Sequence, residues 1–338
     1  MNYCAGNELA FILSKLELVV KCYDCSGVNV MKRTLPFLFG FLCFPPAFTY
    51  AQAGRNFDAV QVETKQVQGN IYMLVGAGGN VTVQIGADGV LLVDTQFAPM
   101  APKILAAVRK LSDKPIRYII NTHVHTDHSG GNEALAKPDG AKIVAHENVL
   151  KVMRALKDGT ADDRFRAAQG SWPTEIFTDR KTLHFNGEDI EIIHIPGAHS
   201  AGDSIVFFRG SNVISGGDVF AIVRYPVVDF DGGGRVPGMI AGLNQIIALS
   251  DPSKAKGRTY IIPGHGRLCD REDVIKYRDM SVILQKRVQE MINKGMTLKQ
   301  VQAAKPTWDY EPLYGATTGL ATTDSFIEDL YNSLTAKK

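Results

Sequence analysis

Short apolar segments separated by glycine turns run along the chain from Asn70 onward. Residues 70–79, 80–89 and 90–95 alternate or run apolar, and the glycine and Asp-Gly breaks between them are typical of hairpins. They predict an antiparallel meander. A helix over 99–111 follows, with apolar residues at helical spacing after Pro99. A buried strand at 116–122 then leads directly into a group of histidines.

The same rhythm continues to the end of the chain. The pattern predicts strands at 141–146, 181–185, 188–195, 203–208, 212–218 and 258–266, and helices at 147–156, 237–249, 271–293 and 323–334. Strands outnumber helices in two successive blocks, and each block ends in helices. We therefore predict two packed β-sheets with helices outside, a layered α/β sandwich. No linker or repeat divides it, so residues 54–338 are predicted to form one domain.

The first 53 residues have a different pattern. From Met31 two cations precede an apolar run, and small residues follow in the order Ala51-Gln52-Ala53. This layout is typical of a secretory signal peptide cleaved after Ala53, and the apolar run is too short for a permanent membrane anchor. We predict a periplasmic or secreted protein whose true start is Met31, with residues 1–30 an over-extended reading frame. The alternative is a buried or anchoring N-terminal helix.

The net charge gives no indication of a nucleic-acid or membrane partner. A net charge of +2 supplies no basic field for nucleic acid and no polybasic membrane patch, which leaves a small-molecule substrate as the expected partner. Nothing in the sequence sets the oligomeric state. Cys269 is the only cysteine of the predicted mature chain, so no intrachain disulfide can form there. We expect Cys269 to be a packed thiol rather than a metal ligand.

Residues suited to metal binding gather where predicted strands end. They are His123, His125, Asp127 and His128 after one strand, and His199, Asp218 and His265 after three others. Imidazole and carboxylate without thiolate favour zinc, with manganese, iron or nickel as alternatives. Side chains alternate along an extended segment, so both rings of the His-x-His point to one side while Asp127 and His128 face elsewhere. One segment can thus serve two adjacent metals.

With these residues in this order, the chain resembles the metallo-β-lactamase superfamily, whose signature is H-x-H-x-D-H followed by a His, a bridging Asp and a final His. The resemblance covers residues 70–270 and implies a four-layer αβ/βα sandwich with a two-metal groove. It implies one zinc held by His123, His125 and His199. A second zinc would be held by Asp127, His128 and His265, and Asp218 would bridge the two.

The resemblance also implies roles in catalysis. Zinc lowers the pKa of bound water to about 7, so a hydroxide shared by two zinc ions would be the nucleophile near neutral pH. Asp127 would orient this hydroxide and shuttle its proton. Asp94 resembles the buried aspartate that braces the metal loop in this family, although it could also cap the helix that follows. Asp218 could instead simply cap a turn.

The family includes several classes of enzyme, so the fold does not identify the substrate. A secreted hydrolase with a preformed groove favours the opening of a β-lactam or a lactone, and β-lactamase activity, with antibiotic resistance, is the leading hypothesis. A lactonase or a glyoxalase II-like thioesterase is the alternative. A non-catalytic periplasmic binding or relay protein is the third.

Two departures weaken the β-lactamase hypothesis. β-Lactamases usually carry Cys or Ser where this chain has Asp218, and one group keeps a Lys where this chain has Ala221. Arg224 or Arg235 could bind the substrate carboxylate instead. We expect the glycine-rich hairpin tip, Gly76–Asn80, to border the groove and close over substrate. His146, His184 and His194 are expected to be structural.

Overall fold

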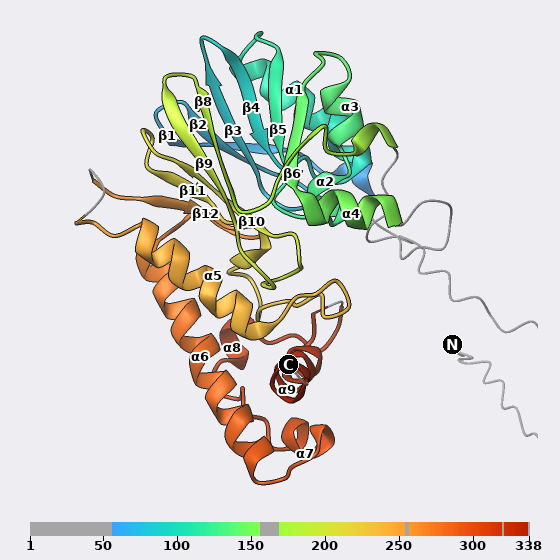
Figure 1. Cartoon of the computed structure of the whole chain (residues 1–338), viewed down its shortest axis with the longest axis vertical. Coiled ribbons are helices and arrows are strands. Elements are labelled where there is room, and N and C mark those ends of the chain that lie inside the picture. Colours follow the sequence, from blue (N-terminus) through green and yellow to red (C-terminus); the bar gives the residue numbers. More distant parts are fainter. Residues whose placement is uncertain (1–55, 156–168, 254–256, 320, 337–338) are drawn as a thin grey trace, which may run out of the picture. The chain divides into compact units, whose positions relative to one another are not determined.

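Two mixed β-sheets form the centre of the protein in a computed structural model that describes residues 56–155, 169–253, 257–319 and 321–336. The signal peptide, the Met31 start and the rest of the N-terminal segment up to residue 55 lie outside these residues. All described residues belong to one compact unit, residues 50–338. Figure 1 shows the two sheets with helices outside them.

The first sheet has seven strands in chain order. They are β1 (Glu63–Gln68), β2 (Ile71–Val75), β3 (Val81–Gly86), β4 (Gly89–Val93), β5 (Ile116–Ile120), β6 (Lys142–His146) and β7 (Glu175–Phe177). Strands β2 to β4 form the predicted antiparallel meander, β1 pairs antiparallel with β2, and β4 to β7 run parallel. Parallel strands place their carboxyl ends at one edge of the sheet, so the loops after β4 and β5 are neighbours.

The second sheet has six strands in the order β13-β12-β11-β10-β9-β8. They are β8 (Arg180–Phe185), β9 (Glu188–His194), β10 (Ser204–Phe208), β11 (Val213–Ser215), β12 (Tyr260–Ile262) and β13 (Cys269–Asp270). Only β11 and β12 pair in parallel. Their carboxyl ends therefore emerge side by side, and they lead to Asp218 and His265 respectively.

Helices cover the outer face of each sheet. They are α1 (Ala101–Leu111), α2 (Thr126–Ser129), α3 (Asn132–Ala136), α4 (Glu147–Ala155), α5 (Val236–Leu249), α6 (Arg271–Asn293), α7 (Leu298–Ala303), α8 (Glu311–Tyr314) and α9 (Thr323–Thr335). Single 3-10 turns lie at Phe57–Ala59, Ala98–Met100, Gln169–Ser171 and Gly217–Val219. A capping box fixes the start of α6. The side chain of Asp270 accepts the backbone N–H of Glu272 and Asp273, and the side chain of Asp273 accepts the backbone N–H of Asp270.

Three apolar cores separate the layers. Ile120 of the first sheet and Phe208 of the second belong to the core between the sheets. Helices α1 and α3 pack on the other face of the first sheet, and α5, α6 and α9 pack on the second. The layers therefore run helix, sheet, sheet, helix, which confirms the predicted αβ/βα sandwich.

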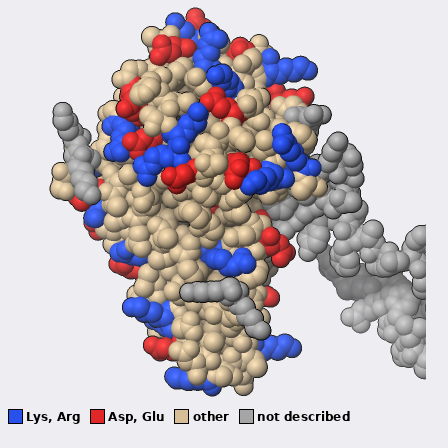
Figure 2. Space-filling model, in the orientation of Figure 1, with Lys and Arg blue, Asp and Glu red and all other residues tan. Residues whose placement is uncertain are grey.

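The charged residues at the surface agree with the small net charge of the chain. Figure 2 shows lysines and arginines interspersed with aspartates and glutamates on the face it draws. Among the described residues, no helix is long and apolar enough to cross a bilayer.

Candidate metal centre

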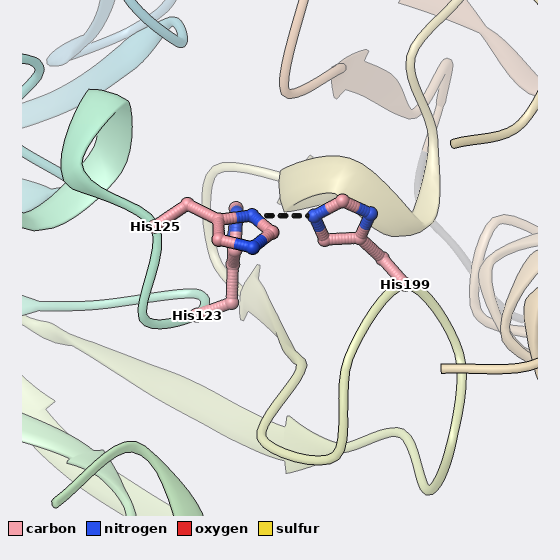
Figure 3. A group of neighbouring side chains, drawn as sticks. All are labelled: His123, His125 and His199. Atoms are coloured by element: carbon pink, nitrogen blue, oxygen red, sulfur yellow. Dashed lines mark hydrogen bonds between the residues drawn. The ribbon is translucent and has the colours of Figure 1, made fainter. Parts of the chain in front are cut away.

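Three histidines from two segments meet at the end of β5. His123 and His125 follow this strand, and His199 lies in the loop between β9 and β10. Figure 3 shows the three rings turned toward one another. The Nδ1 of His125 and the Nε2 of His199 are 2.8 Å apart. The Nε2 of His123 is buried and has no hydrogen-bond partner among the residues that the structure describes. A buried nitrogen without a partner among imidazoles fits a metal ligand, because otherwise its desolvation would be uncompensated. We call this group the first half-site.

A second group of ligand atoms adjoins the first. Asp127, His128 and His265 bring potential ligand atoms within 4.8 Å of one another. The Nε2 of His265 lies 3.3 Å from Asp127 Oδ2, and the Nε2 atoms of His128 and His265 are 3.3 Å apart. We call this group the second half-site.

Asp218 lies between the two half-sites. Its Oδ1 is 3.2 Å from the Nε2 of His128 and 3.4 Å from the Nε2 of His265. Its other oxygen, Oδ2, is 3.9 Å from the Nε2 of His199. The two oxygens of this carboxylate thus face different half-sites, as a bridging ligand would.

Asp94 braces the segment that carries these ligands. One carboxylate oxygen accepts the Thr122 backbone N–H at 2.8 Å, and the other accepts the Thr122 hydroxyl at 2.7 Å and lies 2.8 Å from His128 Nδ1. Asp94 is almost fully buried, with a backbone φ of 65° that few non-glycine residues adopt. It is not the N-cap of the following helix, which is Met100. Asp94 therefore orients the imidazole of His128.

Glycines allow this close packing. A Cβ on Gly264 would lie 2.0 Å from Asp218 Oδ1, and one on Gly217 would lie 2.6 Å from the Cβ of Thr122. Gly217 also has a φ of 50°, which glycine adopts without strain. The position of Asp218 between the two half-sites depends on both glycines.

The hairpin tip Gly76–Asn80 is packed against the metal centre, so the prediction that it closes over substrate is wrong. The backbone N–H of Gly79 donates to the Asp127 carbonyl at 2.9 Å, and that of Asn80 donates to the Gly264 carbonyl at 2.7 Å. A Cβ on Gly79 would lie 2.2 Å from the Cε1 of His128. The glycines of the tip permit close approach, and the tip walls the second half-site.

Residues 225–236, which we call the support loop, hold the first half-site from behind. The ring Nδ1 of His199 lies 2.8 Å from the Val227 carbonyl, and the Nε2 of His125 lies 3.2 Å from the carboxylate of Asp229. These bonds leave the opposite ring nitrogens directed at the centre. The sequence did not single out Asp229. A carboxylate in a glycine-rich loop was the available signal, but Asp231 shares it.

The histidines of the two half-sites differ in the direction in which their pKa is shifted. Burial lowers the pKa of His123 well below its usual value and also lowers the pKa of His125. Burial acts in the same direction on His128 and His265, but neighbouring carboxylates, Asp218 foremost, raise the pKa of both rings. Burial works to raise the pKa of Asp218, yet His265 and His128 hold it well below the usual range. His123 and His125 are therefore held neutral, whereas the second half-site holds ion pairs.

Comparison with known proteins identifies the family. The family model described as the metallo-beta-lactamase superfamily matches residues 74–265. The chain belongs to the metallo-β-lactamase superfamily. It is a hydrolase of that superfamily with a His/Asp cluster suited to metal binding.

Relatives within the superfamily differ in activity. The chain is 24% identical over 209 residues to acyl-coenzyme A thioesterase MBLAC2 of Homo sapiens, covering 58% of this chain and 72% of the relative. It is 30% identical over 151 residues to a hydroxyacylglutathione hydrolase of Pelagibacter ubique, covering 44% of this chain and 54% of the relative.

Solved structures share the fold at lower identity. A metallo-β-lactamase from Pontibacter korlensis superposes with a TM-score of 0.53 at 17% identity, covering 66% of this chain and 99% of the other. The sec-alkylsulfatase Pisa1 of Pseudomonas sp. gives a TM-score of 0.58 at 18% identity, covering 80% and 50%. These likenesses show the metallo-β-lactamase fold.

The two candidate substrate-binding arginines lie in different surroundings. The guanidinium of Arg235 donates to the Phe230 and Gly234 carbonyls at 2.8 and 2.5 Å and stacks 3.7 Å from the Phe230 ring centroid. It is engaged within its own loop. Arg224 is partly buried, and its Nε has no acceptor within the described part of the chain. No hydrogen bond or ion pair found among the described residues joins either arginine to the seven predicted ligands.

The remaining histidines and the cysteine lie apart from the metal centre. His146 and His194 stack in parallel with ring centroids 3.6 Å apart, and His184 pairs with Asp189 at the surface. Cys269 is buried in the core of the second sheet, and burial raises the pKa of its thiol to about 12. Such a thiol is packed and unreactive, as predicted.

Proposed function

We propose that the protein is a two-zinc hydrolase that cleaves an ester bond to oxygen or sulfur, such as a lactone or a thioester. The observation that carries the two-metal assignment is the position of Asp218, whose two oxygens face different half-sites. His123, His125 and His199 would hold one zinc. Asp127, His128 and His265 would hold the other, with Asp218 between them.

The nitrogen and carboxylate donors suit zinc better than iron or manganese. When bound, the two ions would supply Lewis acidity, which lowers the pKa of water and offsets negative charge on a carbonyl oxygen. All other steps fall to residues of the chain.

Asp127 is the residue best placed to handle protons. About a quarter of its side chain is exposed, 26%, whereas Asp218 is 7% exposed. Burial works to raise the pKa of Asp127, but His128 and His265 hold it below the usual range, so it is a carboxylate at neutral pH. An accessible carboxylate in this form can orient the attacking water and carry its proton toward the leaving group.

The surroundings favour an ester over a cyclic amide. Four residues face the second half-site (Asp127, His128, Asp218 and His265), so few positions remain there for a departing amide nitrogen. Alkoxide and thiolate leaving groups need less help than an amide nitrogen. The hairpin tip is packed against the centre, so it is not a flap over a substrate ring. The names of the thioesterase and hydroxyacylglutathione hydrolase relatives support the same class.

β-Lactam opening is the second candidate. Arg224 favours it, because its Nε has no acceptor among the described residues and a carboxylate of the substrate could provide one. Ala221 stands where one group of β-lactamases has a lysine, so Arg224 would have to replace that cation.

A side-by-side substrate panel tests the proposal. The purified chain is offered a penicillin, a cephalosporin, a carbapenem, an acyl-homoserine lactone, S-lactoylglutathione and a short acyl-coenzyme A. We expect kcat/KM for an ester or thioester to exceed any β-lactam value by about 100-fold, a difference of about 2.7 kcal/mol in transition-state stabilisation. All activity should disappear with a chelator and return with zinc. A β-lactam as the best substrate would overturn the ester assignment. Two bound zinc ions without turnover of any substrate would favour a binding or relay protein.

We also propose export to the periplasm or the medium, on the strength of the segment Met31–Ala53. N-terminal sequencing of the protein from its native host tests this separately. We expect a mature start at Gly54, and a start well before it would contradict export.

A further inference from the structure

A buried aspartate closes the loop that carries His199. Residues 195–203 join β9 to β10, and His199 lies near their middle (Figure 3). At the end of this loop the carboxylate of Asp203 binds Ser200, the residue that follows His199. Its Oδ2 accepts the Ser200 backbone N–H at 2.6 Å, and its Oδ1 accepts the Ser200 hydroxyl at 2.8 Å. Both oxygens thus bind the residue next to a predicted metal ligand.

The backbone of Asp203 is held in place independently of its carboxylate. Its carbonyl accepts the Ile195 N–H at 2.8 Å and lies 2.8 Å from the Nδ1 of His194, which closes the base of the loop. The next residue, Ser204, donates its N–H to the Thr122 carbonyl at 2.8 Å and so joins the start of β10 to the segment after β5. The carboxylate therefore extends from a fixed point between the two sheets.

The peptide between His199 and Ser200 is held from both sides. Asp203 accepts its N–H, and the backbone N–H of Asp229 in the support loop donates to its carbonyl oxygen at 2.8 Å. The side chain of the same Asp229 lies 3.2 Å from the Nε2 of His125. A shift of this peptide would therefore affect the surroundings of two rings of the first half-site.

The side chain of Asp203 is buried with its partner. Asp203 is 1% exposed and Ser200 is 3% exposed. Burial raises the pKa of Asp203 to about 6, against the lowering effects of His199 and of the Ser200 hydrogen bonds. The group is therefore mainly ionised at neutral pH, and its oxygens act as acceptors. Without Asp203 the buried N–H of Ser200 would lose its acceptor, which is costly, so we expect the peptide to move.

We propose that Asp203 is a positioning residue for the first metal, because it holds the His199–Ser200 peptide and so sets the direction of the His199 ring. The proposal rests on the proposed two-metal function. The His199 ring directs its Nε2 at the centre while its Nδ1 stays within reach of the Val227 carbonyl, 2.8 Å away. That geometry requires the backbone of His199 to keep its place. Loss of an outer support of this kind typically weakens metal binding.

Metal binding to the stripped protein tests this without a substrate. Two backgrounds isolate the half-sites: His265→Ala leaves the first to be measured, and His123→Ala leaves the second. Zinc affinity is measured at pH 8 by competition with a chromophoric chelator, and cobalt substitution reports the ligand geometry through its visible spectrum. In the His265→Ala background, Asp203→Ala should raise the Kd for zinc about 10-fold and shift the cobalt spectrum. In the His123→Ala background it should change Kd by less than about twofold.

Matched variants separate positioning from general loss of structure. Asp203→Asn keeps an oxygen that can accept the Ser200 N–H and should restore most of the affinity. Ser200→Ala removes the hydroxyl bond but keeps the N–H bond, so it should weaken the first half-site by less than Asp203→Ala. Asp251→Ala is the control, because Asp251 accepts the N–H and the hydroxyl of Ser253 at 2.9 Å in the loop after α5. It should leave both affinities unchanged.

Three results would overturn the proposal. The first is unchanged first-site affinity in Asp203→Ala, or in Ser200→Ala if Asp203→Ala does not fold. The second is equal weakening of both half-sites. The third is an Asp203→Asn variant as weak as Asp203→Ala, because the charge of the carboxylate and not its hydrogen bonds would then be responsible. A wild-type chain that binds fewer than two zinc ions would instead contradict the two-metal assignment, so the two failures are distinguishable.

Discussion

The two half-sites are neighbours, yet different forces hold their side chains in place. In the first, three imidazoles are oriented by a backbone carbonyl and a buried carboxylate of the support loop. In the second, rings and carboxylates hold one another as ion pairs, with Asp94 behind His128 and the hairpin tip alongside. The first joins three imidazoles, of which His123 and His125 are held neutral, and the second is a cluster of imidazoles and carboxylates.

This difference matters for metal binding. A ligand must give up its proton before it can bind a metal. The first half-site has little to give up, because burial lowers the pKa of His123 and His125. In the second, the carboxylates that attract a metal cation also stabilise the protons on His128 and His265. The metal must displace these protons before the rings can bind it. Protons therefore compete with metal mainly at the second half-site.

Removing one histidine from each half-site tests the division most strongly. His123→Ala should lose the first metal and keep the second, and His265→Ala should do the reverse. Each should lower kcat/KM by about 10²–10³-fold or more, the scale of losing one group that stabilises charge in the transition state. Zinc content by elemental analysis should show about one equivalent in each variant and about two in the wild type. Loss of both metals from either variant would show that the half-sites are not separable.

Lowering the pH should empty the second half-site before the first. The pKa of both His128 and His265 is raised, so their protonated forms are favoured in the metal-free protein, and a metal that binds there must displace those protons. Affinity at the second half-site should therefore fall with pH by up to about 10-fold per unit for each displaced proton. Affinity at the first should change little until the pH falls below the lowered pKa values of His123 and His125. Zinc titrations between pH 8 and 6 in the two single-histidine variants check this, and equal slopes would refute it.

The hairpin tip offers a change that affects only the second half-site. In Gly79→Ala the new Cβ would lie 2.2 Å from His128 Cε1, so the ring or the hairpin must move. We expect the Kd for the second zinc to rise about 10–100-fold, as when an outer support of a ligand is lost. Gly210→Ala is the control, because its Cβ would meet the Cβ of Glu188 at 3.0 Å, away from the centre. Loss of the first metal instead would contradict the assignment of the hairpin tip to the second half-site.

A substitution of Asp229 is the matching test at the first half-site. Asp229→Asn removes the negative charge near the Nε2 of His125 and should raise the Kd of the first zinc about 10-fold. The second zinc should be unaffected. Asp231→Asn, two residues along the same loop and exposed, is the matched control. Chelator competition measures both.

The smallest effect is expected outside both half-sites. Cys269→Ser should leave zinc content and kcat/KM within about twofold, and in the wild type the Cys269 thiol should react with a maleimide only after unfolding. The physical reason is burial, which raises the pKa of the thiol to about 12. Rapid labelling of the folded protein, blocked by zinc, would place Cys269 at the centre instead.

The sequence predicted much of this arrangement because the signals are local. Periodicity located the central strands and long helices, and strand ends carry the seven residues that the structure brings together. Strand β1 was missed because it is a polar, largely exposed edge strand without an apolar pattern. Strand β7 was missed because it has only three residues.

Other features depend on contacts between distant segments. Neither the pattern of residues 225–236 nor that of α9 indicates that the rings of Tyr225 and Phe326 stack. Asp229 and Asp231 look alike in the sequence, and only folding buries one of them. The glycines of the hairpin tip suggested a lid, because glycine marks both flexibility and close packing. In the structure these glycines allow close packing.

The spacing of the ligands along the chain has a consequence for folding. His125 and His199 are 74 residues apart, and His128 and His265 are 137 residues apart. Ligands from both segments can bind one zinc only after these loops are closed, and the packed sheets close them without metal. The newly made protein should therefore fold without zinc and take it up last. Zinc uptake would then select chains that have already completed both sheets.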